Sequence, residues 1–343
     1  MTENNSSTPL ALWNSVIGHS APKSLLQNAL SKNTVPHALL FTGPSGVGKR
    51  TLARAFAAQL LANSVGKGDN AEYQRVQTMV ASGNHPDLLH VGTGTENKEI
   101  KVDDIRELCL SLHRKPFNGG CSVAIIDNAH MMNPSASNAL LMTLEEPPAH
   151  AFPILVSDKP QLLLPTIRSR CQPITLGLLN LEDTHRVVTN LCPTMEPKAC
   201  THLAQILEGS IAGLGIEDLI NPRTMQPVDQ EEMRKVLAAH IEREERFSKE
   251  LDALFNDPTG DDSDLRQAAV LGFELGSTKE DSVHSWSLIL SSLRRKLRNS
   301  PTSSATHWAN SVIKAAERAG KAEQRHLNLP LQLTQILVDT TRP

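Results

Sequence analysis

The chain has 343 residues and 39% hydrophobic residues, enough for two or three globular domains. Its formal net charge of −3 gives no general attraction to nucleic acid or to an anionic membrane, so any contact with DNA must be local or shared with a partner. The N-terminus lacks the basic start and apolar run of a signal peptide, and no apolar run approaches the ~20 residues of a membrane span. The five cysteines form no C-x-x-C pair, which predicts reduced thiols in a cytoplasmic protein and no metal site.

The first predicted strand, 38–42, runs into a glycine-rich turn. The turn, GPSGVGK at 43–49, has the G-x4-G-K spacing of a loop whose backbone N–H groups wrap phosphate oxygens while its lysine reaches the outer phosphates. The next position normally offers a hydroxyl to magnesium, but it is Arg50 here, and Thr51 comes one residue late. A glycine-rich turn without a ligand is the alternative interpretation.

Short apolar runs recur between helical patterns and predict an α/β fold with a parallel sheet and crossover helices. The predicted strands are 38–42, 87–91, 122–127 and 152–157, with 173–176 as a candidate fifth. Three helices follow from apolar spacing and capping signals: one carrying Leu52, Phe56 and Leu60, one from about Asp103 carrying Ile105, Leu108 and Leu112, and one over 134–145 capped by Asn133.

The strand at 122–127 ends in a carboxylate, Asp127, at the edge of a parallel sheet where ligands bind. In nucleotide hydrolases this aspartate holds magnesium, and a glutamate that follows it commonly polarises water. The following residue here is Asn128, whose amide can orient water but cannot accept its proton. Arg50 and Asn128 therefore both predict that the chain has no ATP turnover of its own.

Two arginines, Arg168 and Arg170, lie in the segment TIRSRC at 166–171. Solvated surface arginines are the simple interpretation. A planar, always-charged guanidinium is also the group that stabilises phosphoryl-transfer charge in trans, so an arginine on a subunit edge can act in another subunit's site.

Helical patterns dominate the C-terminal part. Residues 179–216 predict a small helical unit, 217–232 a polar connection, and the spacing from Met233 onward a series of helices. The basic run LRRKLR at 293–298 is interpreted as a solvated helix face, with contact to DNA phosphates as the alternative.

Four segments together resemble the AAA+ domain of bacterial clamp-loader subunits: PHALLFTGPSGVGK, HPDLL, IIDNAHMMNPSASNALLMTLEEPP and LPTIRSRC. The resemblance covers roughly residues 10 to 215, and NALLMTLEEPP and SRC are its most specific motifs. It implies an AAA+ P-loop domain with a parallel five-stranded sheet over 1–178, a small helical lid over 179–220, and an all-helical collar domain for oligomerisation over 221–343.

The resemblance also implies roles for single residues. The implied cofactor-binding set is Val16 and Gly18 near adenine, the loop residues Gly43, Gly46, Gly48, Lys49 and Thr51, the magnesium carboxylate Asp127, and the polar sensor Ser157. Arg170 matches the arginine finger that, in this family, enters the ATP site of an adjacent gamma or tau subunit. The family's second sensor arginine, expected near Ala212 or Gly213, is absent, which is a third departure that predicts no turnover.

The function implied is that of a stator-like subunit in the clamp loader of the DNA polymerase III holoenzyme, which helps load a sliding clamp onto primed DNA. Implied partners are gamma or tau and delta subunits, with the clamp and primer-template DNA reached through the complex. ATP or ADP is the expected ligand, even if a vestigial one, and zinc is not expected because 60–87 holds no cysteine. Two alternatives stay open: a self-sufficient gamma- or tau-type ATPase, and a non-replicative AAA+ adaptor that holds nucleotide structurally.

Overall fold

The computed structural model describes residues 12–65, 70–92, 99–118, 120–214, 216 and 229–256. These residues belong to two compact units. The first lies within 1–191 and includes 209–212 and 216, while the second comprises 192–208, 213–214 and the residues from 231 onward. The predicted basic run 293–298 lies outside the described residues.

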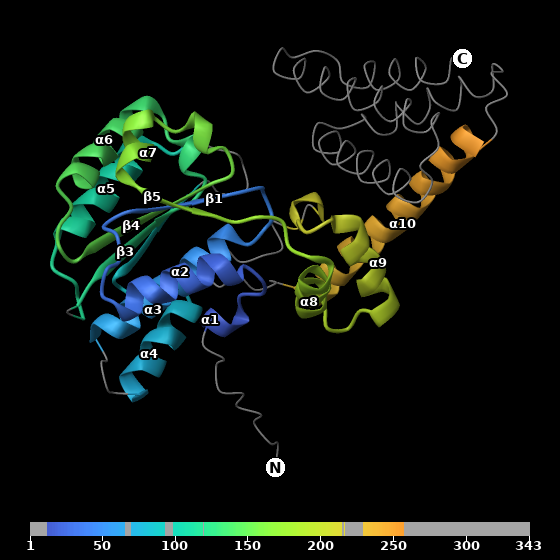
Figure 1. The fold of residues 1–343 in the computed structure, drawn as a ribbon, viewed down its shortest axis with the longest axis horizontal. Helices are drawn as coiled ribbons and strands as arrows, with labels where there is room; N and C mark the ends of the chain where they lie inside the picture. The colour runs from blue at the N-terminus through green and yellow to red at the C-terminus, as the bar shows by residue number, and fades with distance from the viewer. Residues whose placement is uncertain are drawn as a thin grey trace. The chain divides into compact units, whose positions relative to one another are not determined.

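A parallel five-stranded sheet forms the centre of the first unit (Figure 1). Its strands are β1 (Leu39–Thr42), β2 (Leu88–Val91), β3 (Ser122–Ile126), β4 (Ala151–Ser157) and β5 (Gln172–Thr175). Their order is β2-β3-β4-β1-β5, and every neighbouring pair is parallel. The five predicted strands and the α/β class with a parallel sheet are thus confirmed. Because all strands point the same way, the segments that follow β1, β3 and β4 meet at one edge of the sheet.

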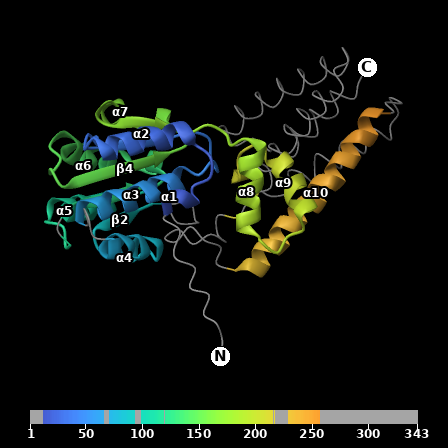
Figure 2. The same cartoon turned by 60° about the horizontal axis from the view of Figure 1, so that its bottom comes forward.

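Helices cover both faces of this sheet, as Figures 1 and 2 show. One face carries α1 (Leu12–Ser15), α2 (Ser20–Ser31), α3 (Lys49–Val65) and α4 (Asn70–Ala81), and the other carries α5 (Val102–His113), α6 (Pro134–Glu145) and α7 (Pro165–Arg170). Side chains of β1 alternate between the two cores: Leu39 and Phe41 pack in the first, and Leu40 packs in the second.

The predicted helical stripes are buried. Leu52, Phe56 and Leu60 of α3 and Ile105, Leu108 and Leu112 of α5 all lie in the cores. The Asn133 cap of α6 is also confirmed, since its Oδ1 accepts the N–H of Ala136 at 2.8 Å. In the described part of the chain, no helix combines the length and apolarity needed to cross a membrane.

Helix α4 was not predicted, and it changes the environment of α3. It covers the outer side of α3, where Tyr73 donates its hydroxyl to Gln59 Oε1 at 2.7 Å. The guanidinium of Arg54 in α3 is buried and donates to the carbonyls of Val80 and Ala81 at the C-terminal end of α4. Burial lowers the pKa of Arg54 to about 10, which leaves it charged at neutral pH and favourably placed at the negative end of the helix.

Helices continue beyond the sheet, as the sequence predicted. They are α8 (Leu181–Leu191) in the first unit, and α9 (Pro197–Leu207) and α10 (Gln230–Asn256) in the second. His202 Nε2 of α9 lies 3.8 Å from Glu245 Oε1 of α10. Helix α10 begins inside the predicted polar connection 217–232. The domain boundaries at 178 and 220 stay predictions.

Candidate functional site

The turn between β1 and α3 requires glycine at two of its positions. The backbone φ angle is 139° at Gly43, 67° at Gly46 and 94° at Gly48, a region that side chains disfavour. A Cβ atom added at Gly43 would lie 2.2 Å from the carbonyl oxygen of Leu176, and one added at Gly46 would lie 2.1 Å from the backbone nitrogen of Ala212. Conformation and space therefore both select glycine at 43 and 46.

Every carbonyl oxygen from residue 43 to residue 48 accepts a hydrogen bond. The donors are Lys49 Nζ to Gly43 (3.0 Å) and Pro44 (2.6 Å), Ser210 Oγ to Ser45 (2.7 Å), Ile211 N to Gly46 (3.1 Å), His19 Nε2 to Val47 (2.7 Å) and Leu52 N to Gly48 (3.0 Å). In a trans peptide the N–H points away from the C=O, so the loop N–H groups are turned away from these donors. Successive N–H groups held in this way form the kind of concavity that binds anions.

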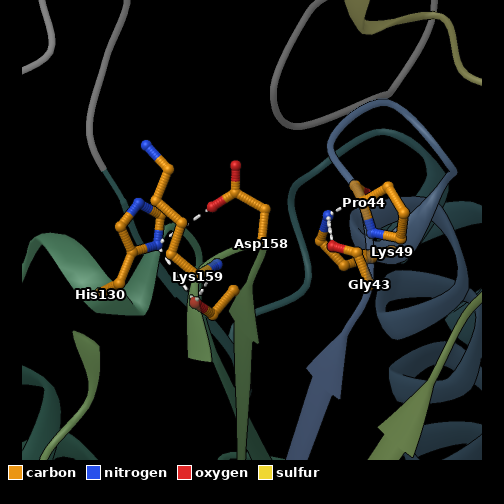
Figure 3. A network of polar contacts seen from close by, with 7 residues as sticks. Gly43, Pro44, Lys49, His130, Asp158 and Lys159 are labelled. Carbon is orange, nitrogen blue, oxygen red and sulfur yellow. Dashed lines mark hydrogen bonds and ion pairs between the residues drawn. The ribbon is translucent and has the colours of Figure 1, made fainter. Parts of the chain in front are cut away.

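Lys49 is folded back over its own loop (Figure 3). Its side chain is buried, and burial lowers its pKa, while the nearby carboxylates of Asp158 and Asp127 act in the opposite direction. Lys49, which the sequence predicts to bind phosphate, thus contacts the carbonyls of its own loop and has acidic groups close to it.

An ion pair joins the start of α3 to the end of β3. Arg50 Nη2 contacts Asp127 Oδ2, and the two side chains are 30% and 5% exposed, respectively. The residue that replaces the magnesium hydroxyl therefore contacts the residue that matches the magnesium carboxylate. Thr51 lies half-buried one residue further along α3, about 100° around the helix, and so does not take the position of Arg50.

The predicted sensor Ser157 is fully buried at the end of β4 and belongs to a polar cluster with His130, Asp158 and Lys159. The last three residues are labelled in Figure 3. Its Oγ accepts the N–H of Lys159 at 3.1 Å and lies 3.2 Å from His130 Nδ1, and Asp158 Oδ1 is 3.4 Å from the same nitrogen. Burial lowers the pKa of His130, and Asp158 opposes that shift. The sequence interpretation missed His130 and Asp158.

The segment predicted to lie near adenine is tied to the loop. Val16 is buried and accepts a hydrogen bond from Lys23 Nζ at 2.9 Å. Gly18 has a φ of 72°, and His19 next to it holds the carbonyl of Val47. His19 and Lys23 were not among the predicted site residues.

The segment where the second sensor arginine was expected packs on the phosphate loop. Ser210 and Ile211 donate hydrogen bonds to two loop carbonyls. The N–H of Ala212 donates to Ser210 Oγ at 3.2 Å. This segment thus braces the loop and supplies no cation to it. Within the described ranges, no group of three or more His, Cys, Asp and Glu side chains is arranged to hold a metal ion.

Arg170 is the last residue of α7. Its Nη1 donates to the carbonyl of Thr166 at 3.0 Å, and its Nη2 lies 2.7 Å from Glu145 Oε1, the last residue of α6. The side chains of Arg170 and Glu145 are 34% and 49% exposed. Cys171, which follows, is buried, and burial raises its pKa to about 12, so its thiol packs in the core.

Arg170 and the phosphate loop lie at opposite edges of the sheet. Arg170 precedes β5, and Gln172 N at the start of β5 donates to the carbonyl of Ala38, just before β1. The loop follows the other end of β1. The structure therefore brings together Lys49, the Arg50–Asp127 pair and Ser157, and places Arg170 away from them.

Comparisons with known proteins find sequence similarity to subunits of DNA polymerase III. Residues 18–180 match the family model described as DNA polymerase III, delta subunit. The delta' subunit of DNA polymerase III from Pseudomonas aeruginosa is 39% identical over 135 residues, which are 39% of this chain and 41% of that protein. The tau subunit from Escherichia coli K12 is 34% identical over 206 residues, covering 57% of this chain and 31% of that protein. The matched segments thus span less than half of these relatives' lengths.

Two solved structures from Thermotoga maritima are also similar. A gamma subunit-related protein of DNA polymerase III has a TM-score of 0.47 and 18% identity, covering 92% of this chain and 99% of that one. The RuvB Holliday junction branch migration motor has a TM-score of 0.45 and 17% identity, covering 79% and 86%. Over residues 18–180, the chain is therefore similar in sequence to clamp-loader subunits of DNA polymerase III, including a delta' subunit.

Proposed function

We propose that the chain acts as a stator-like delta-prime subunit, which assembles with gamma or tau and delta subunits and supplies Arg170 to the ATP site of a neighbour. In this role it helps load a sliding clamp onto primed DNA without hydrolysing ATP itself. The observation that carries the proposal is the position of Arg170 at the edge of the sheet opposite the chain's own phosphate loop.

Distance separates Arg170 from its own loop. The strand β1, with four residues, lies between the edge that holds Arg170 and the edge that holds the loop. At a rise of about 3.3 Å per residue, that strand alone spans roughly 13 Å, more than an arginine side chain can bridge. A phosphate at the loop is therefore out of reach, so any phosphate that Arg170 contacts belongs to another molecule.

Features of the chain's own site argue against hydrolysis there. Arg50 is paired with Asp127, Asn128 cannot act as a base, and the segment 209–212 carries no arginine. Because the chain is also similar to a tau subunit, a gamma- or tau-type ATPase is the alternative function. Measured turnover by the isolated chain at even about 1 per second, the low end of ordinary enzyme rates, would favour that rival.

Transfer of Arg170 to a partner costs little. Its pair with Glu145 is exposed, and exposed ion pairs typically contribute about 0–1 kcal/mol. An arginine finger acting in trans can accelerate phosphoryl transfer on the order of 10³-fold at one site. The gain at a neighbour's site therefore far exceeds the loss of the Glu145 contact.

The test compares Arg170→Ala, Arg170→Lys and the control Arg168→Ala in complexes reconstituted with gamma or tau and delta subunits. We expect all three to assemble. Clamp- and DNA-stimulated ATP hydrolysis should fall for Arg170→Ala and almost as far for Arg170→Lys, because an ammonium cannot reproduce the planar fork of a guanidinium. The rate of ATP hydrolysis by the whole complex should fall less than the rate at the affected site, because the other ATP sites keep their own arginine fingers.

Two results would contradict the proposal. Arg170→Ala complexes that hydrolyse ATP at the wild-type rate would remove the trans-acting role. Failure of the unmodified chain to co-purify with clamp-loader subunits from native extracts would favour a non-replicative adaptor.

A further inference from the structure

The fold family implies a magnesium ion beside the loop, and the residues present do not fit one. Magnesium prefers oxygen ligands in near-ideal octahedral geometry. The position that should offer a hydroxyl is Arg50, and its guanidinium already contacts the one carboxylate, Asp127, that matches a magnesium ligand. Arginine stays protonated at any physiological pH, so this cation cannot leave by losing a proton.

Charge also opposes a divalent ion at this place. Lys49 and Arg50 supply two positive charges, and Asp127 and Asp158 are the acidic groups that act on Lys49. Without a nucleotide these four charges sum to zero, so the protein's own groups offer a divalent ion no net negative charge, and the ion would lie next to a buried lysine. A further positive charge beside that lysine is costly where water is largely excluded.

The backbone of the loop is nevertheless kept in its anion-binding form. All six carbonyl oxygens from 43 to 48 are held by Lys49, Ser210, Ile211, His19 and Leu52, and this bracing turns the N–H groups away from the protein partners. None of these donors involves Arg50 or Asp127. The anion-binding backbone and the altered metal position are thus structurally separate features.

We propose that the Arg50 guanidinium stands in for the divalent cation, so that a nucleoside diphosphate or triphosphate binds this loop without magnesium. The loop N–H groups and Lys49 then hold the phosphates, and Arg50, anchored by Asp127, supplies the remaining positive charge. The inference concerns the chain's own loop and does not depend on Arg170.

Calorimetric titration of ADP into the full-length chain tests this, once in EDTA and once in millimolar magnesium chloride. The dissociation constant should agree within about twofold between the two buffers, a difference of roughly 0.4 kcal/mol. In Arg50→Thr, which restores the hydroxyl and frees Asp127, magnesium should tighten binding by about tenfold, or 1.4 kcal/mol. Arg168→Thr is the control for loss of an arginine and should behave as wild type.

The Lys49→Ala variant shows whether the measured binding heat comes from ADP at this loop. It should weaken ADP binding equally in both buffers. Circular dichroism of each variant checks that it is folded. The inference is overturned if the wild-type chain needs magnesium to bind ADP, if it binds ADP in neither buffer, or if a folded Arg50→Thr variant shows no response to magnesium.

Discussion

The two arginines at opposite edges of the sheet are held in different ways. Arg50 pairs with Asp127, whose side chain is 5% exposed, whereas Arg170 pairs with Glu145, whose side chain is 49% exposed. A buried carboxylate that loses its partner cannot be fully compensated by water, and an exposed one can. The comparison teaches that Arg50 is held by a buried partner, whereas the partner of Arg170 is half exposed to solvent.

The comparison is tested first by removing the acidic partner at each edge. Asp127→Asn keeps the shape of the side chain but leaves Arg50 without a counter-charge, so we expect a loss of about 2 kcal/mol in the free energy of unfolding, less than for a fully buried pair because Arg50 is partly solvated. Glu145→Gln should cost no more than about 0.5 kcal/mol. Urea denaturation of both variants measures the difference, and equal losses would break the comparison.

The second prediction separates two contributions to stability: contact of the loop with the segment 209–212, and the positive φ angles of its glycines. Gly46 and Gly48 both have positive φ angles, but an added Cβ meets Ala212 at Gly46 and nothing within 4 Å at Gly48. Gly46→Ala and Gly48→Ala should share a conformational cost of about 1–2 kcal/mol. Gly46→Ala should lose a further ~1–3 kcal/mol from overpacking against 209–212.

The matched pair is compared by the same denaturation experiment. Similar stabilities for Gly46→Ala and Gly48→Ala would mean that the segment 209–212 is not held against the loop in solution. The hydrogen bonds from Ser210 and Ile211 to the loop carbonyls would then not form in solution.

The smallest effect concerns a buried and an exposed histidine. His85 is buried, its Nδ1 accepts the N–H of Asp87 at 3.2 Å, and burial lowers its pKa although Asp87 and Glu72 oppose the shift. Because the unfolded chain binds this proton more readily, the contribution of His85 to stability is complete above its unfolded pKa of about 6.5 and is lost as pH falls below it.

We therefore expect His85→Asn to flatten the decline in the free energy of unfolding between about pH 6.5 and 5. The exposed His113 is replaced in the same way as the control for the removal of a histidine side chain. A His85→Asn variant with the wild-type slope would show that burial does not control this titration.

The features that the sequence predicted correctly are local ones. The strands, the loop with its glycines, and the Asn133 cap are encoded by residues close together in the chain, through short apolar runs, G-x4-G-K spacing and a capping side chain. The contact of Arg50 with Asp127 was not predicted, although the sequence analysis assigned both positions to the same magnesium site.

The features that were missed depend on residues far apart in the chain. Ser210 Oγ and the carbonyl of Ser45 are 165 residues apart, and only the folded chain shows that they meet. His130 and Asp158 similarly join Ser157 through the convergence of segments after β3 and β4. Helix α4 carries few apolar residues in a clear stripe, and its position follows from packing on α3, including the buried Arg54.

The most direct test of the central claim is the number of ATP molecules hydrolysed in the first turnover of a reconstituted clamp-loading complex. Rapid-quench measurement after mixing with clamp and primed DNA compares complexes that contain the wild-type chain or Arg170→Ala. If Arg170 serves a single neighbouring site, the amplitude of the fast phase should fall by about one ATP per complex, because a site without its finger is slowed on the order of 10³-fold. An unchanged amplitude and rate would contradict the account.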